Sequence, residues 1–325
     1  MQILDLRHQA QDSGVHLVDI SSHSFLALCG HAGESCRIVH LPTENSLSIP
    51  MIDPPRAIAF RPACNELAIA RSDCISRLTA SPSKSGTAII APARHLDVEK
   101  PVALAFNNDG TLLAAGCADG TISIWRLDDA STKGSTLEHR IMKARLSARA
   151  IVAMCFVQDD SRLVAVDGDG RSYLVTLDDE CGRVKAKLLL AGACGNALDW
   201  HCYCVCAHPS KLLVALAGES DIMWMKNLSN GALFALRTGL GKFIHKMAFV
   251  GEGRQLAVAG EKGVIVYEMD ATVLKHKWMY LGDYNLAGRA VLLPRQPGQV
   301  VATFEEGRTI RLMKEVNGTL VMGWS

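Results

Sequence analysis

The sequence lacks any long uncharged apolar run. No stretch of about 18 consecutive apolar residues occurs, so the chain offers no candidate transmembrane helix. The N-terminus, MQILDLRHQAQD, carries two acidic residues and no continuous apolar segment, so we expect no signal peptide. Long helical patterns that alternate with strands are also missing, which argues against an α/β domain. We therefore expect a cytoplasmic or nuclear protein of a reducing compartment, without membrane insertion.

A strong excess of charge of one sign is absent too. The 34 Lys and Arg residues nearly balance 33 Asp and Glu residues, giving a net charge of +1. A protein that neutralises many phosphates is normally more basic, so nucleic acid is a less favoured partner. The 11 cysteines are an odd number in a chain without a secretory signal, which is typical of reduced thiols. With 49% hydrophobic residues, the chain should be globular with a large core.

Residues 102–127 (VALAFNNDGTLLAAGCADGTISIWRL) show the clearest local pattern. Three runs that favour β-structure are separated by Asn107–Gly110 and by Asp119-Gly120. These separating residues favour tight turns and tolerate positive φ. The stretch therefore predicts three antiparallel strands joined by two hairpins.

Six weaker copies of this stretch recur at a spacing of about 45 residues, the length of a four-stranded propeller blade. The copies predict an all-β fold: a single seven-bladed β-propeller of four-stranded antiparallel blades that spans residues 1–325. With Phe106 as the register mark in the first strand, the blades are marked by Ile20, Phe60, Phe106, Phe156, Ala207, Phe249 and Leu293.

The other strands of each blade follow from the same alignment. Third strands should pass through Val39, Leu78, Trp125, Val175, Met225, Tyr267 and Met313. Fourth strands are expected at residues 47–49, 87–91, 140–144, 184–190, 233–236, 274–280 and 319–322. Residues 2–6 (QILDL) and residues 319–322 are both candidates for the outer position of the last blade. We expect residues 2–6 there, because pairing the two chain ends removes an exposed sheet edge.

The repeat resembles the WD-repeat family over nearly the whole chain, most strongly in residues 102–127. There Asp119 occupies the position of the family's Asp in the turn between second and third strands, and Trp125 that of its Trp. Arg126 replaces the Asp that follows the Trp, Ala115 stands where Ser or Thr is usual, and no Gly-His precedes the first strand. The resemblance implies a propeller that lacks the family's complete His-Ser-Asp-Trp hydrogen-bond network.

The most metal-like segment is HCYCVCAH, residues 201–208. Its alternation is that of a strand, which would place Cys202, Cys204 and Cys206 on one face about 6.5–7 Å apart. Zinc brings its sulfur ligands within roughly 4 Å of one another, so ligand pairs usually come from turns. We therefore expect these cysteines to act as small buried hydrophobic residues.

Other candidate sites are equally incomplete. Cys29, His31 and Cys36 have no second ligand pair near them in sequence, and Asp167–Gly170 is not followed by the acid that completes an EF-hand loop. No nucleophile elbow or phosphate-binding loop occurs. We therefore predict no enzyme activity, no cofactor and no metal site.

Charged residues recur at two positions of the repeat, in the turn between second and third strands and just before the first strand. In a propeller both sets emerge at one end, around the mouth of the central channel. They either pair with each other and leave a neutral rim, or form a recognition face for a peptide or domain. The acidic set is Glu34, Asp73, Asp119, Asp169, Glu219, Asp221, Glu261, Glu305 and Glu306. The basic set is Arg56, Lys100, Arg149, His201, Lys242, His245 and Arg289.

A further basic group belongs to the expected outer strands of the third and fourth blades. Its positive charges either protect an edge strand from pairing or dock an acidic partner or an RNA backbone. The group contains His139, Arg140, Lys143, Arg145, Arg183, Lys185 and Lys187.

The favoured hypothesis is a non-catalytic protein–protein interaction scaffold, a subunit or adaptor of a larger intracellular complex whose partners are proteins or peptides. This follows from a multi-sided platform without a catalytic constellation, and in part from the family resemblance. One alternative is a nucleic-acid-associated propeller that uses the basic outer strands. A second is an enzyme or small-ligand binder at the central channel, although expected first strands such as Val102–Leu104 and Ile151–Ala153 are small and apolar. The sequence leaves the oligomeric state open.

Overall fold

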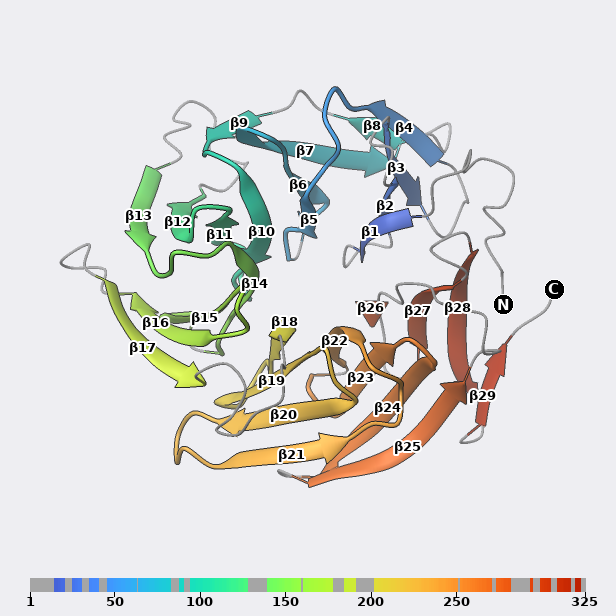
Figure 1. The fold of residues 1–325 in the computed structure, drawn as a ribbon. Coiled ribbons are helices and arrows are strands. Elements are labelled where there is room, and N and C mark those ends of the chain that lie inside the picture. The colour runs from blue at the N-terminus through green and yellow to red at the C-terminus, as the bar shows by residue number, and fades with distance from the viewer. Residues whose placement is uncertain are drawn as a thin grey trace.

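The structure, a computed structural model, is built from β-strands and their connections (Figure 1). It describes residues 15–20, 25–30, 35–40, 46–62, 64–82, 88–90, 94–127, 139–158, 160–177, 184–190, 202–250, 252–270, 273–281, 293–294, 299–304, 309–316 and 319–322. Within these ranges there are 29 strands and no helix. The described strands form six four-stranded sheets and one five-stranded sheet, all with antiparallel pairing. The prediction of an all-β, antiparallel fold is confirmed.

The sheets, numbered 1 to 7 in chain order, are meanders in which consecutive strands pair, except for the last strand of sheet 2. Sheet 1 contains β1 (Val15–Ile20), β2 (Phe25–Gly30), β3 (Ser35–His40) and β4 (Ser46–Pro50). Sheet 2 contains β5 (Ala57–Phe60), β6 (Glu66–Ala70), β7 (Cys74–Pro82), β8 (Ala88–Ile90) and β9 (Arg94–Asp97). Sheet 3 contains β10 (Pro101–Phe106), β11 (Leu112–Cys117), β12 (Thr121–Arg126) and β13 (His139–Arg145). Sheet 4 contains β14 (Ile151–Phe156), β15 (Arg162–Asp167), β16 (Ser172–Leu177) and β17 (Val184–Leu190).

The last three sheets follow the same plan. Sheet 5 contains β18 (Cys202–Ala207), β19 (Leu213–Gly218), β20 (Ile222–Asn227) and β21 (Leu233–Arg237). Sheet 6 contains β22 (Ile244–Val250), β23 (Gln255–Gly260), β24 (Gly263–Asp270) and β25 (Val273–Leu281). Sheet 7 contains β26 (Leu293–Pro294), β27 (Gln299–Phe304), β28 (Thr309–Val316) and β29 (Thr319–Met322).

Two outer positions differ from the expectation. In sheet 2 the fourth position is divided: β8, close to the expected residues 87–91, pairs only with Ala80–Pro82, while β9 pairs with Cys74–Arg77. The long strand β7 makes room for both. In sheet 7 the C-terminal strand β29 pairs with Met313–Val316 of β28, so the C-terminal candidate takes the outer position for which residues 2–6 were preferred. Residues 2–6 themselves lie outside the described residues.

The sheets lie side by side around a central opening, with their first strands innermost (Figure 1). Contacts between first strands run from β1 through β5, β10, β14, β18 and β22 to β26, and β26 in turn contacts β1. Every register mark predicted from the sequence lies in one of these first strands. The repeat in the sequence therefore corresponds to one sheet in space.

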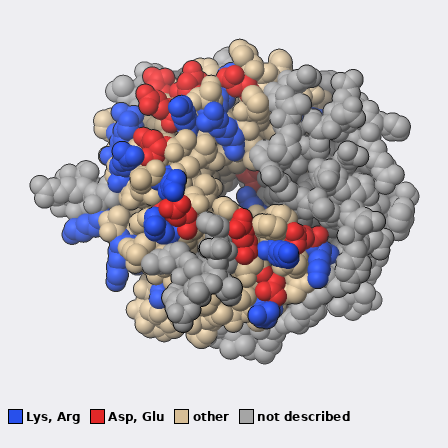
Figure 2. Space-filling model, in the orientation of Figure 1, with Lys and Arg blue, Asp and Glu red and all other residues tan. Residues whose placement is uncertain are grey.

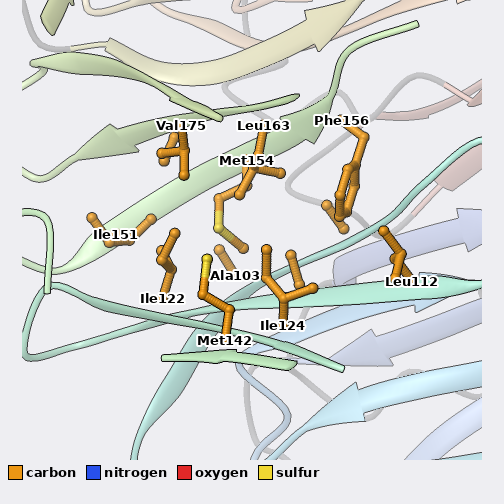
Figure 3. Close-up of a cluster of buried hydrophobic side chains, with 13 residues drawn as sticks. Ala103, Leu112, Ile122, Ile124, Met142, Ile151, Met154, Phe156, Leu163 and Val175 are labelled. Carbon is orange, nitrogen blue, oxygen red and sulfur yellow. The ribbon is translucent and has the colours of Figure 1, made fainter. Parts of the chain in front are cut away.

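The core lies between neighbouring sheets. Between sheets 3 and 4, Ile122 and Ile124 face Ile151 and Leu163, and all four side chains are fully buried (Figure 3). Burying a side chain of this size stabilises the fold by roughly 1.5–3 kcal/mol. Near the centre, where the sheets converge, the first strand supplies small residues such as Ala103, which let the sheets approach closely.

Polar contacts join neighbouring sheets at the end that carries the turns between first and second strands. The Phe60 N–H of sheet 2 donates a hydrogen bond to Asp19 Oδ2 of sheet 1 at 2.6 Å. The backbone and side-chain amides of Asn108 in sheet 3 both donate to Asp160 Oδ1 of sheet 4, at 3.1 and 3.2 Å. These hydrogen bonds fix the spacing of consecutive sheets at that end.

Candidate interaction surface

The opposite end, called the top face, carries the turns between second and third strands and the segments that lead into the first strands. The two kinds of segment touch within a sheet, where Gly168 N–H donates to Ala150 O at 2.8 Å. They also touch between sheets, where Leu146 N–H, on the way into sheet 4, donates to Gly120 O in the turn of sheet 3 at 2.9 Å. Backbone hydrogen bonds therefore join the top-face segments of sheets 3 and 4. In Figure 2, acidic and basic side chains lie intermixed around the central opening.

Two predicted acids of this face accept hydrogen bonds from backbone N–H groups. Asp119 accepts hydrogen bonds from the backbone N–H of Thr121 at 2.9 Å and from its hydroxyl at 2.8 Å. Burial would raise the pKa of Asp119, but the hydrogen bonds from Thr121 outweigh it, so the pKa lies below its usual value. Glu261 accepts from the Lys242 N–H at 2.7 Å. These carboxylates thus satisfy backbone donors, the role in which acidic residues favour tight turns.

One predicted pair of opposite charges meets directly. Arg149 Nε lies 3.1 Å from Asp169 Oδ1, within sheet 4, and Arg171 also lies 3.1 Å from Asp169. The Arg149 side chain is largely exposed, so the pair contributes little stability.

The buried acid of the same turn is Asp167. Its carboxylate accepts hydrogen bonds from the hydroxyls of Ser147 at 2.7 Å and Tyr173 at 3.0 Å, and from the N–H groups of Asp169 and Arg171 at 3.0 Å each. Asp167 therefore holds the turn of sheet 4 rather than a ligand. Ser147 lies 20 residues before Asp167 in the sequence, so no local sequence signal indicates the whole network.

The remaining predicted top-face residues are less engaged. The side chains of Arg56, Asp73 and Lys100 are exposed, while the backbones of Arg56 and Lys100 donate to Ala70 O at 2.9 Å and Ser72 O at 3.0 Å. Six predicted residues lie outside the described part of the chain, namely Glu34, Arg183, His201, Arg289, Glu305 and Glu306.

The basic outer strands do not form one continuous patch. Lys143 of β13 is paired with Ser123, on the face of sheet 3 opposite the buried Ile122 and Ile124 that contact sheet 4. Lys187 of β17 is paired with Leu174, on the face of sheet 4 directed toward sheet 5. By the same alternation Arg145 shares the face of Lys143, and Lys185 that of Lys187. His139 and Arg140 are exposed at the start of β13.

A repeated bulge at the top of the first strands is a feature that the sequence analysis missed. The register shifts by one residue at the second position of five first strands. A bulge redirects side chains and interrupts the alternation of the strand. The residues at the bulge are His16, Val102, Val152, Tyr203 and His245.

The bulge in β18 also corrects one expectation about the cysteines. Cys202 belongs to the core cluster between sheets 4 and 5, whereas Cys204 and Cys206 belong to the cluster between sheets 5 and 6. The three thiols therefore do not share one face, because the extra residue Tyr203 reverses the alternation between Cys202 and Cys204. Burial raises the pKa of all three, so they are neutral thiols at pH 7. Within the described ranges, no group of three or more His, Cys, Asp or Glu residues is arranged to hold a metal ion.

Exposed apolar side chains are the other feature without a sequence signal. Ile52, in the segment that leads into β5, is 90% exposed, Tyr203 is 41% exposed and Phe243, just before β22, is 36% exposed. All three belong to the top face. Their positions in the sequence do not distinguish them from residues of the core. Leu188 and Phe234 are also exposed, but they lie on the outer strands β17 and β21.

Antiparallel meanders arranged around a centre, with first strands innermost, define a fold of the propeller type. Residues 93–126 match the family model of the WD40 repeat, "WD domain, G-beta repeat", which covers β9 to β12. This segment is therefore a WD40 repeat, and the resemblance to the WD-repeat family is confirmed.

Comparison with solved structures agrees over the whole length. A chain in the crystal structure of the mitotic checkpoint complex superimposes with a TM-score of 0.71 at 12% sequence identity, covering 97% of this chain and 95% of that chain. At this identity the likeness concerns the fold. No curated protein sequence matches the chain. Among the described residues, no helix is long and apolar enough to cross a membrane.

Proposed function

We propose that residues 1–325 form one closed, seven-bladed β-propeller that acts as a non-catalytic scaffold for protein partners. Closure is supported by the contact between the first strands of sheets 7 and 1, which joins the two ends of the series. The count of seven is supported by the seven described sheets, each containing one register mark of the sequence repeat. A rigid ring of this kind presents two ends and a rim to partners.

The observation that carries the scaffold proposal is the exposure of Ile52, Tyr203 and Phe243 on one face. Tyr203 and Phe243 belong to the neighbouring sheets 5 and 6, and exposed large apolar residues that gather on one surface are typical of protein interaction sites. The similar chain belongs to a multiprotein assembly, the mitotic checkpoint complex, which supports a role as subunit or adaptor of a larger complex. The nine described cysteines are free thiols, which suits a reducing intracellular compartment.

Affinity isolation with mass spectrometry tests the proposal. Tagged protein is recovered from an extract of the cells that produce it, as the wild type, as Ile52→Asp and as Leu188→Asp. We expect at least one protein to co-purify in stoichiometric amounts with the wild type and Leu188→Asp, and its recovery to fall about tenfold or more with Ile52→Asp, because a charge in a desolvated contact is strongly unfavourable.

Leu188→Asp is the matched control, since it introduces the same charge at an exposed apolar position of the rim. Thermal unfolding of both variants checks that each remains folded. The scaffold proposal fails if no protein co-purifies, even after crosslinking in the extract. If both variants retained the partners equally, the top face would not be the surface that binds them.

A further inference from the structure

His208 joins sheets 5 and 6 at the end opposite the top face. It lies in the turn between β18 and β19 of sheet 5 and is only 2% exposed. Its ring contacts that of Phe249 in β22 of sheet 6, with ring centroids 5.0 Å apart and an interplanar angle of 55°. The imidazole is therefore buried where two sheets meet.

The neighbouring turn of sheet 6 closes directly over this imidazole. Gly253, between β22 and β23, has a φ of +85°, and a Cβ added to it would lie 2.2 Å from His208 Cε1 and 2.3 Å from Nε2. Glycine has no Cβ, so its backbone can approach the ring this closely. The imidazole thus lies between the turns of the two sheets, and both turns pack on it.

The hydrogen bond of His208 within its own turn requires a neutral ring. The Ser210 N–H donates to Nδ1 of His208 at 3.1 Å. A backbone N–H can only donate, so Nδ1 must present its lone pair. A proton added to Nδ1 would bring two N–H groups together in a buried place and leave the Ser210 N–H without its acceptor, which is unfavourable.

The charges around the ring also favour its neutral form. Burial lowers the pKa of His208, the positive charge of Lys211 in the same turn lowers it further, and a hydrogen bond to the Gly253 backbone opposes both only in part. In the turn of sheet 6, Glu252 and Arg254 flank Gly253, are exposed and have opposite charges. Among the residues that the structure describes, no carboxylate forms an ion pair with the imidazole.

We propose that His208 is an acid-released latch: its neutral imidazole holds the turns of sheets 5 and 6 together, and protonation of Nδ1 separates them. The charged ring needs water, which it reaches only when the turn that contains Gly253 moves away. Near the top face the two sheets stay joined, because the contact between the Cys204 thiol and Ile244 O, 3.6 Å apart, does not involve His208. This device acts within the fold and does not depend on the scaffold function.

The direction of the pH effect follows from the protonation of the closed and open states. An unfolded histidine has a pKa of about 6.5, and buried His208 has a lower one. The open state therefore binds the extra proton more readily than the closed state. The contribution of the latch to stability is complete above about pH 6.5 and is lost as the pH falls from there through the folded-state pKa.

Hydrogen exchange of the full chain, followed by mass spectrometry at pH 7.5 and 5.0, tests the latch. Protection of the backbone amides is expressed relative to the intrinsic exchange rate at each pH. In the wild type, residues 208–213 and 252–255 should lose protection about fivefold or more at pH 5.0, while residues 121–126 of β12 should keep theirs within about twofold. The Cε1–H NMR signal of His208 should titrate over the same pH range.

The variant His208→Asn separates the proton from the hydrogen bond. An asparagine side chain accepts from the backbone N–H two residues on, but it does not titrate. The two turns of this variant should be less protected than in the wild type at both pH values, since the ring contacts are lost, but their protection should differ by less than about twofold between pH 7.5 and 5.0. His139→Asn is the matched control, because His139 is exposed at the start of β13, and it should show the loss seen in the wild type. Circular dichroism at pH 7.5 confirms that both variants are folded.

The inference is overturned if the two turns of the wild type keep their protection at pH 5.0, or if acid reduces protection as strongly in His208→Asn as in the wild type. An equal loss in β12 would also overturn it, because acid would then loosen the whole fold rather than this junction. None of these results affects the partner test with Ile52→Asp, so the two proposals fail separately.

Discussion

Replacing Glu66 by glutamine should lower the free energy of unfolding by about 3–5 kcal/mol, because it removes the carboxylate that contacts two buried guanidinium groups. Glu66 lies between Arg61 and Arg77, and the three side chains are only 8%, 7% and 3% exposed. Arg61 Nη1 lies 3.1 Å from Glu66 Oε2, and Arg77 Nε donates to Glu66 Oε1. Arg61 Nε also donates to Gly110 O of sheet 3 at 2.6 Å, so the cluster connects two sheets.

Denaturant unfolding followed by circular dichroism measures this effect. Glu268→Gln is the control, since Glu268 is an exposed glutamate near the end of strand β24 and its replacement should change stability by less than about 0.5 kcal/mol. Equal stabilities of the two variants would show that the buried cluster contributes nothing beyond a surface charge.

Acid should remove the difference in the free energy of unfolding between the wild type and Glu66→Gln. Burial by itself raises the pKa of Glu66, but the hydrogen bonds and charges of Arg77 and Arg61 outweigh it and hold the pKa below its usual value. A lowered folded-state pKa contributes stability above the pKa of an unfolded glutamate, about 4.3, and this contribution is lost as the pH falls through the folded-state value. The stability difference should therefore be constant near pH 7 and shrink below about pH 4.

Gly120→Ala is expected to be the second strongly destabilising change, by about 3 kcal/mol or more. Gly120 has a φ of +84°, and a Cβ there would lie 2.1 Å from Ser147 O and 2.7 Å from Arg149 O. Both atoms are backbone, so the segment that leads into sheet 4 would have to move. The left-handed conformation adds about 1–2 kcal/mol and overpacking adds about 1–3 kcal/mol.

The variant Gly231→Ala separates the effect of the left-handed backbone conformation from that of overpacking. Gly231 has a similar φ of +75°, but nothing lies within 4 Å of an added Cβ. The same unfolding measurement should give a loss of only about 1 kcal/mol for this variant. Equal stabilities of the two alanine variants would contradict the close contact of the turn of sheet 3 with the segment that leads into sheet 4.

Most of the fold could be predicted from the sequence because its signals are local and repeated. The turn residues at Asn107–Gly110 and Asp119-Gly120 and the apolar runs between them specify a meander, and the copies place a meander every 45 residues or so. The family resemblance rests on Trp125 and Asp119, and the match of residues 93–126 to the WD40 family model confirms it. The predicted outer strands were right except in sheet 2, where β8 and β9 share the position, and in sheet 7, where β29 takes the position for which residues 2–6 were preferred.

The candidate site could be predicted only in part. The sequence identified the charged turns of the top face, and the structure brings Arg149 to Asp169 and the Lys242 backbone to Glu261. Nothing in the sequence indicates that Tyr203 and Phe243 are exposed, because an aromatic residue in or beside an apolar strand is normally part of the core. Tyr203 lies in the bulge of β18, which appears only when the strands pair.

Residues close along the chain specify the strands, the turns and their repetition. Which face each side chain takes and which charges meet depends on the tertiary contacts. Arg61 follows β5, Glu66 begins β6 and Arg77 lies within β7, so the three form a buried cluster only after these strands pair. Cys202 and Cys204 separate into different cores because of one extra residue. The physical reason is that pairing register and burial depend on contacts between segments distant in sequence, which local periodicity does not encode.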